Sequence, residues 1–238
     1  MGRSVVLAGA ARCTGCRLPP RWCVCGQIPP VATPLRVHVL IHRHEYGKPS
    51  STGRLVARVV TAAACHVYQR ATRFLPASGF PVERPADTGE LWILHPNGEP
   101  LPEAPVATRE APGPELILLD GTWRQAGEML RSIEGLGRCY RLPPAATAEP
   151  SRFWLRDQAG PDRLSTAESL AAAFIRLGDA TSARGLRLHF ELHVYVTLLA
   201  RGRRDMAERY LGLSPLLREA AAVLDRLHAR QPHGPAAH

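Results

Sequence analysis

Runs of aliphatic and β-branched residues alternate with segments of helical periodicity along most of this chain. The runs predicted to be strands are residues 35–42, 90–96, 115–120 and 138–143. The segments predicted to be helices are residues 54–67, 122–133, 165–178, 186–203 and 214–229. Strands that alternate with helices form parallel sheets, because each parallel pair needs a long crossover connection. The sequence therefore predicts an α/β fold with a largely parallel sheet and flanking helices.

Unusual residues follow three of the predicted strands. They are LHPNG at 94–98, LDGTW at 119–123 and LPP at 142–144. In open α/β sheets, ligands bind at the carboxyl ends of the strands, where the loops leave the sheet. The sequence therefore predicts a ligand site at these loops, together with the loop after Ile41. The proline-rich segment 96–114 is predicted to be irregular and exposed.

The carboxylate of Asp120 ends the clearest strand, directly after aliphatic residues. It is a candidate general base, and it is equally a candidate N-cap for the helix that begins at about Thr122. Gly121 lets the backbone approach a ligand or turn sharply. Thr122 caps the helix or binds a ligand. Trp123 stacks on a base or anchors the helix in the core, and the core is the more common place for tryptophan.

Four of the six cysteines crowd into the segment CTGCRLPPRWCVC. They are Cys13, Cys16, Cys23 and Cys25, whereas Cys65 and Cys139 stand alone. In a reducing compartment such a cluster favours a structural zinc ion over disulfides, and four thiolates leave no open position for catalysis. We predict a zinc knuckle over residues 11–30, an α/β domain over 31–230 and a disordered tail over 231–238.

The formal net charge is +9, and Lys48 is the only lysine among the 30 basic residues. Such an excess favours a polyanionic partner, RNA or DNA, although for any single arginine a solvated surface position is the simpler explanation. The residues predicted to contact RNA lie in three clusters: Arg12, Arg17 and Arg21 beside Trp22; His42, Arg43, His44, Lys48, Ser51, Thr52 and Arg54; and Arg152 with Arg156.

No apolar run approaches the roughly 20 residues that span a bilayer, and the N-terminal apolar stretch is short for an export signal. We therefore predict a cytoplasmic protein with no membrane association and no obligate protein partner. The motif HFELH places His189 and His193 one helical turn apart, as in a metal pair. Because no third ligand is evident, the motif is predicted to belong to a packing helix.

The chain resembles the DTW-domain family, which is named for an Asp-x-Thr-Trp signature. The motifs that carry the resemblance are the cysteine cluster ending in IPP, the HRHE…STGR loop, LHP, LDGTW and RLSTAES, in this order over about residues 12–200. Two positions depart from the family pattern: Ser51 stands where an asparagine is usual, and His95 stands where an aromatic residue is common. The family is similar to the SPOUT class of RNA-modifying enzymes, which implies a knotted C-terminal part.

The resemblance implies a tRNA-uridine aminocarboxypropyltransferase. Such an enzyme moves the 3-amino-3-carboxypropyl group of S-adenosylmethionine to N3 of a uridine and releases methylthioadenosine. Asp120 is the implied catalytic residue. The implied cofactor-binding residues are Leu94, His95, Pro96, Leu119, Gly121, Thr122, Trp123, Leu142, Pro143, Leu164, Ser165, Thr166 and Glu168. The helix that begins at Ser165 suits a carboxylate ligand, and an ordinary capping box explains the same residues.

Two other functions remain open at this point. A SPOUT-type RNA methyltransferase would use the same cofactor and release S-adenosylhomocysteine. A zinc-knuckle RNA-binding protein without catalysis would bind RNA regardless of S-adenosylmethionine and of Asp120. The by-product distinguishes the aminocarboxypropyltransferase from the methyltransferase. Mutation of Asp120 distinguishes both enzymes from the RNA-binding protein.

Overall fold

The computed structural model describes residues 11–70, 73–74, 80, 89–103, 113–144, 150–156 and 164–230. The chain forms two compact units. The first comprises Met1–Pro29, Arg152–Asp157 and Arg187–His238, and the second comprises Pro30–Ser151 and Gln158–Leu186. The predicted tail 231–238 lies outside the described residues, as do parts of the predicted loops 96–114 and 144–163.

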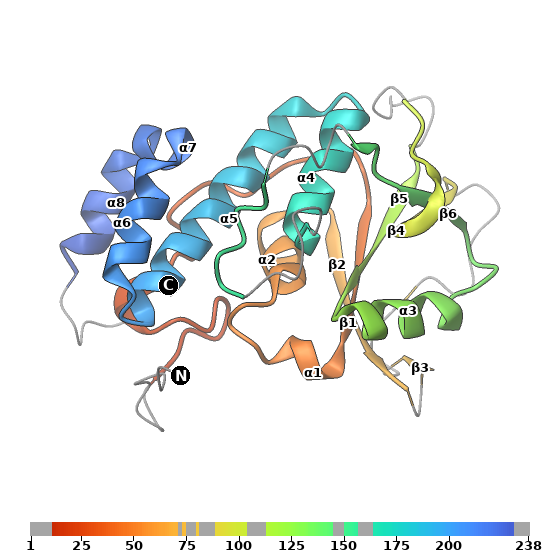
Figure 1. Ribbon diagram of the computed structural model, residues 1–238, viewed down its shortest axis with the longest axis horizontal. Coiled ribbons are helices and arrows are strands. Elements are labelled where there is room, and N and C mark those ends of the chain that lie inside the picture. The colour runs from red at the N-terminus through yellow and green to blue at the C-terminus, as the bar shows by residue number, and fades with distance from the viewer. Residues whose placement is uncertain are drawn as a thin grey trace. The chain divides into compact units, whose positions relative to one another are not determined.

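The second unit contains one sheet in the order β3-β2-β1-β5-β4-β6 (Figure 1). Its strands are β1 Val37–His42, β2 Ala63–Gln69, β3 Arg73–Phe74, β4 Leu91–Pro100, β5 Glu115–Asp120 and β6 Arg138–Arg141. Neighbouring strands are parallel except β3, which runs antiparallel to β2. The predicted α/β fold with a largely parallel sheet is confirmed.

Helices cover the sheet of the second unit. They are α1 Arg43–Tyr46, α2 Thr52–Val59, α3 Trp123–Ser132 and α4 Thr166–Arg176, and α5 Ala180–Ala200 begins in this unit. Met129 of α3 packs with Leu40, Ile93 and Ile117 in a fully buried cluster. Because successive side chains in a strand point to opposite faces, Asp120 lies on the face opposite Ile117. Residues at the starts of α2 and α4 contact Asp120 on that face.

The predicted helix over 54–67 is wrong in its second half. The helix α2 ends at Val59, and β2 follows and pairs with β1 along its whole length, from Val37 opposite Ala63 to His42 opposite Tyr68. His66 of β2 lies 3.1 Å from Nδ1 of His38, whose other ring nitrogen contacts Glu115 at 2.9 Å. Pairing and this buried contact override the helical propensity of the alanine-rich segment.

The first unit contains helices from the carboxyl-terminal part of the chain. Besides the end of α5 they are α6 Arg204–Gly212, α7 Pro215–Glu219 and α8 Ala221–His228, with a 3-10 turn at Pro20–Trp22. The sequence did not predict α6, and the predicted helix 214–229 is broken at Ala220. Within the described part of the chain, no helix is both long and apolar enough to cross a membrane.

The HFELH motif belongs to the buried face of α5, as predicted. His189 donates a hydrogen bond of 2.8 Å from Nε2 to the carbonyl of Pro29. Glu191 accepts a short hydrogen bond from the hydroxyl of Ser214, which caps α7. Buried polar groups that are satisfied in this way hold helices together, so the motif has a structural explanation without a metal.

Candidate functional site

A topological switch point lies between β1 and β5. The connection from β1 leads through α2 to β2 on one side, whereas that from β5 leads through α3 to β6 on the other. The two strands are neighbours, and Ile41 pairs with Asp120. Ligands of open α/β sheets bind in the crevice where connections diverge in this way. Asp120 therefore ends β5 at the position that this fold uses for binding.

Two hydroxyl groups hold the carboxylate of Asp120, which is only 7 % exposed. Ser51 donates a hydrogen bond of 2.7 Å to Oδ2, and Thr166 donates one of 2.6 Å to Oδ1. Ser51 is the N-cap of α2 and Thr166 is the first residue of α4. The carboxylate thus joins β5 to the amino ends of two helices, where positive partial charge stabilises an anion.

The helix cap is a different residue from Asp120. Thr122 is the N-cap of α3, and it forms a complete capping box with Gln125: the backbone N–H of Thr122 donates to Oε1 at 2.7 Å. The alternative explanation of Asp120 as a cap is therefore wrong. Trp123, the first residue of α3, is 48 % exposed, so the expectation that it anchors the helix in the core is wrong as well.

Gly53 permits the contact between α2 and Asp120. A Cβ atom at this position would lie 2.6 Å from both Cβ and Cγ of Asp120, closer than such atoms approach in proteins. Gly53 was not among the residues predicted for the site. Its only signal was its position after Ser51 and Thr52 at the start of a helix, where glycine is not required by the backbone.

The substitution Gly53→Ala is expected to displace the carboxylate. Overpacking of this kind costs about 1–3 kcal/mol of stability, and a shift of about 1 Å in a catalytic group costs about 100-fold in rate. The quantities to measure are the melting temperature and the rate of RNA modification. Gly47→Ala is the matched control, because a Cβ there has no heavy atom within 4 Å. Equal activity of the two variants would contradict the tight contact.

Most of the other predicted cofactor-binding residues gather at the same edge. Strands β5, β4 and β6 are parallel neighbours, so their carboxyl ends, and the residues that follow, lie side by side. These residues are Leu119 and Gly121 at the β5 end, and Leu142 and Pro143 after β6. Leu164, Ser165, Thr166 and Glu168 join them through the bond from Thr166 to Asp120. Leu94, His95 and Pro96 were predicted to follow a strand, but they lie within β4, which runs to Pro100 and whose pairing with β5 ends at Leu94.

Two of these residues have local partners. Burial lowers the pKa of His95, so its ring is neutral near pH 7, and Nδ1 accepts a hydrogen bond of 3.2 Å from the backbone of Asn97. Glu168 forms a capping box with Ser165 and accepts a hydrogen bond from Ser151 at 2.9 Å. The capping box predicted as the alternative explanation of the RLSTAES segment is therefore confirmed. Within this segment, Thr166 is the residue that contacts Asp120.

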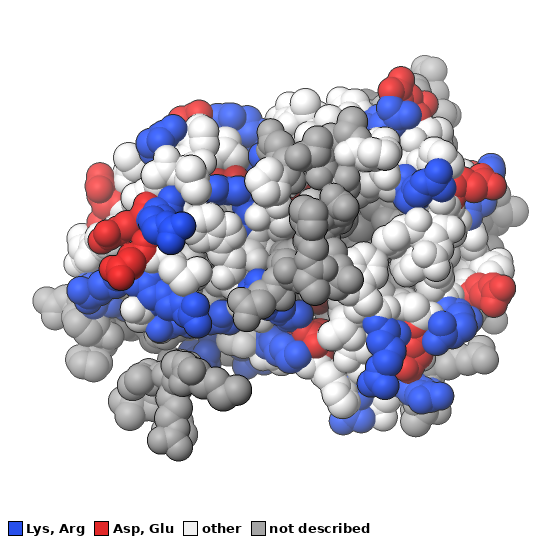
Figure 2. Space-filling view, viewed as in Figure 1, with Lys and Arg blue, Asp and Glu red and all other residues white. Residues whose placement is uncertain are grey.

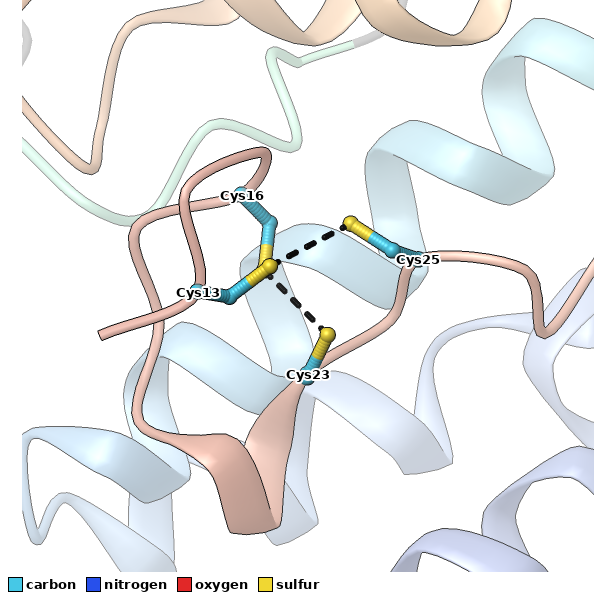
Figure 3. A group of neighbouring side chains, drawn as sticks. All are labelled: Cys13, Cys16, Cys23 and Cys25. Carbon is cyan, nitrogen blue, oxygen red and sulfur yellow. Dashed lines mark hydrogen bonds between the residues drawn. The ribbon is translucent and has the colours of Figure 1, made fainter. Parts of the chain in front are cut away.

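In the first unit, the four clustered cysteines converge (Figure 3). All four sulfur atoms lie within 4.8 Å of one another, with Cys13 3.7 Å from Cys25 and Cys16 3.8 Å from Cys23. Four sulfurs bound to one zinc ion at about 2.3 Å would lie about 3.8 Å apart. The residues therefore fit a tetrahedral metal site, as predicted from their spacing. Cys65 and Cys139 lie outside it.

Two thiols of this cluster, those of Cys16 and Cys23, resist ionisation on their own. A hydrogen bond with Cys23 lowers the pKa of Cys16, but the hydrogen bond with Cys25 and burial outweigh it and raise the pKa to about 11. Hydrogen bonds with Cys16 and Cys25, followed by burial, raise the pKa of Cys23 as well. A divalent cation would supply the charge that four thiolates need, so metal binding is expected to release protons.

The knuckle packs against the carboxyl-terminal helices of its own unit. Arg230, just after α8, donates a hydrogen bond of 2.6 Å to the carbonyl of Cys23. The ring of Trp22 meets His228 edge to face at 5.6 Å, and His228 is hydrogen-bonded to the hydroxyl of Tyr195 at 3.0 Å. The cysteine cluster is therefore part of the packing of the first unit rather than an isolated appendage.

Several residues predicted to contact RNA are buried or have partners within the protein. Ser51 and Thr52 are buried, and Ser51 is engaged with Asp120. Lys48 contacts the buried Glu45 at 2.6 Å, and Arg152 contacts Glu191 at 3.8 Å and lies over the ring of Tyr210. The role of these residues in RNA binding stays a prediction.

The remaining residues of these clusters differ in exposure. His42 is buried, and burial followed by the charge of His44 lowers its pKa; Arg43 and His44 are exposed. Arg54 lies over the ring of Tyr46. Arg12 is exposed, Arg21 lies over Trp22 and Arg156 over Phe153, and Arg17 has a left-handed backbone with φ of 63°. Their role in RNA binding stays a prediction.

Comparison with known protein families gives one match. A family model described as the DTW domain matches residues 10–198, most of the chain. The matched span includes the cysteine cluster, Asp120 and the amino end of α4. No solved structure matches the chain.

Proposed function

We propose that this chain, which belongs to the DTW-domain family, transfers the 3-amino-3-carboxypropyl group of S-adenosylmethionine to N3 of a uridine in tRNA. Membership in the family supports an enzyme that modifies tRNA in general. The observation that carries the finer proposal is the buried Asp120 carboxylate, held by Ser51 and Thr166 at the switch point of the sheet. A protein that only binds RNA has no need of such a group.

The residues at this edge fit S-adenosylmethionine by their chemistry. Leu142 and Pro143 are partly exposed and offer apolar surface to an adenosine, and the carboxylate of Asp120 complements a cationic sulfonium. When bound, the molecule supplies an electrophilic carbon next to sulfur. A bond forms between this carbon and N3 of uridine, the carbon–sulfur bond breaks, and its electron pair stays on the sulfur of methylthioadenosine. The N3 proton passes to the carboxylate of Asp120.

Each residue around Asp120 has a separate task in this proposal. The hydroxyls of Ser51 and Thr166 fix the direction of the carboxylate and leave lone pairs on both oxygens for the proton. Such orientation contributes much of the rate in a reaction whose leaving group needs no protonation. Trp123, exposed at the start of α3, offers an aromatic face for stacking on an unpaired base. A knotted C-terminal part, a structural zinc ion and a cytoplasmic location complete the proposal.

The test is incubation of the purified protein with total tRNA and S-adenosylmethionine labelled in the carboxypropyl group. Label in a nucleoside with the mass of aminocarboxypropyluridine, with methylthioadenosine as the by-product, is expected. S-adenosylhomocysteine would identify a methyltransferase instead. The absence of any nucleoside mass gain, from a protein that still binds tRNA, would favour a non-catalytic RNA-binding protein and sink the proposal.

A further inference from the structure

The positive charge of this protein is concentrated in one of its two units. The first unit contains 14 arginines and six carboxylates, a formal net charge of +8, whereas the second contains 16 basic residues and 15 carboxylates, a net charge of +1. The candidate catalytic residue Asp120 belongs to the second unit. Charge of one sign attracts polyanions over long distances, so the two units differ in the ligand they suit.

A rigid turn between α5 and α6 gathers arginines of the first unit. The helix α5 ends at Ala200, and Gly202, two residues further on, has a φ of 73°. The backbone N–H of Arg203 donates to the carbonyl of Leu198 at 2.9 Å. This hydrogen bond and that from Gly202 to Leu199 form a Schellman motif, which fixes the course of the chain. The turn therefore fixes the backbone positions of Arg201 and Arg203.

A second segment of the unit lies against this turn. Arg201 donates a hydrogen bond of 2.9 Å from Nη1 to the carbonyl of Leu155, which brings the adjoining Arg156 close to it. The neighbouring charges of Arg203 and Arg156, after burial, lower the pKa of Arg201, so the three cations act on one another. Among the described residues, neither Arg201 nor Arg203 forms an ion pair with a carboxylate.

This arrangement is unfavourable unless an anion is present. Like charges repel at short range, and Arg203 and Arg204 lie at the amino end of α6, where the helix dipole disfavours cations. Asp205 in the first turn offsets only part of the charge. Figure 2 shows basic side chains gathered at the lower left, where α6 and the end of α5 lie in Figure 1. A phosphate group would neutralise this surface.

We propose that Arg156, Arg201 and Arg203 form a docking surface for the phosphate groups of tRNA. The inference rests on the proposed function for the identity of the RNA. Guanidinium groups suit phosphate because their paired N–H donors match two phosphate oxygens. A polynucleotide is favoured over a free phosphate, since the charge excess extends over the whole unit rather than one pocket. Arg201 and Arg203 lie beyond the residues that the family model matches.

The experiment measures binding of purified total tRNA at several salt concentrations, without S-adenosylmethionine. Arg201→Gln with Arg203→Gln is expected to weaken binding about tenfold or more and to reduce the salt slope by about two. The matched control is Arg209→Gln with Arg226→Gln, which removes the same charge from exposed positions of the same unit. Arg201→Lys with Arg203→Lys is expected to restore most of the binding, because lysine keeps the charge.

Equal weakening by both pairs of glutamine substitutions would show that net charge alone matters and would overturn the docking surface. Unchanged binding of the Arg201 and Arg203 variant would overturn it as well. Competition by millimolar inorganic phosphate as effective as that by tRNA would point to a small anion instead. Failure of the proposed function is separate: wild-type protein would then bind tRNA through these arginines and form no product.

Discussion

The variant Asp120→Asn is expected to lose product formation by about 100-fold to 10,000-fold, the contribution of a general base, while it folds normally. Asparagine has nearly the size and shape of aspartate. Its amide oxygen still accepts a hydrogen bond, and the hydroxyl of Thr166 can turn to accept one from the amide nitrogen. The link between β5, α2 and α4 therefore survives, and the capacity to take up a proton does not.

Single-turnover kinetics with saturating tRNA and S-adenosylmethionine measure this effect, with tRNA affinity and melting temperature measured alongside. Thr166→Val is the comparison variant, because it removes one orienting hydrogen bond and leaves the carboxylate. We expect it to be impaired less than Asp120→Asn. If Asp120→Asn formed product within a few-fold of wild type, the role as base would be lost. If Asp120→Asn were partly unfolded at the assay temperature, the loss of rate would indicate a structural role instead.

Loss of the metal is expected to have the largest effect on stability. Cys23 is fully buried, and its carbonyl accepts the hydrogen bond from Arg230, so Cys23→Ser breaks the site at its contact with the carboxyl-terminal residues. Structural zinc sites contribute about 10–16 kcal/mol in isolated peptides. A loss of even about 5 kcal/mol here would lower the melting temperature by about 10–20 °C.

Metal content by mass spectrometry and hydrogen exchange measure this prediction. We expect one zinc ion per chain in the wild type and none in Cys23→Ser, with faster exchange in α8 and the end of α5. Cys139→Ser is the control, because Cys139 lies in β6, outside the metal cluster. A variant that lost the metal and kept the wild-type melting temperature would contradict the structural role of the site.

Local sequence patterns predicted those parts of the fold whose signals are local. The strand predicted from the aliphatic run that ends on Asp120 is confirmed, and so is the convergence of the four cysteines predicted from their spacing. Each of these features depends on only a short segment of the chain. The second half of the predicted helix 54–67 was assigned wrongly, because β2 begins at Ala63. The alanines of this segment favour a helix, and only pairing with β1 overrides that preference.

The surroundings of Asp120 could not be predicted for a related reason. Ser51 and Thr166 lie 69 and 46 residues away in the sequence, and nothing in their own neighbourhoods points to a carboxylate. Both occur in helix-start patterns that predict a cap, and both do begin helices. The exposure of Trp123 was missed because it follows from the direction in which α3 leaves the sheet, which no periodicity encodes.

The first unit draws its residues from three segments that are far apart in the sequence, which sets an order of events during synthesis. Cys23 and Arg230, which are hydrogen-bonded, are 207 residues apart. At about 5–20 residues per second, a ribosome needs about 10–40 s to make the segment between them. The four thiols leave the exit tunnel before the carboxyl-terminal helices, against which the knuckle packs, have been made. Early zinc binding would protect the nascent thiols from oxidation until Arg230 and the helices before it have been made.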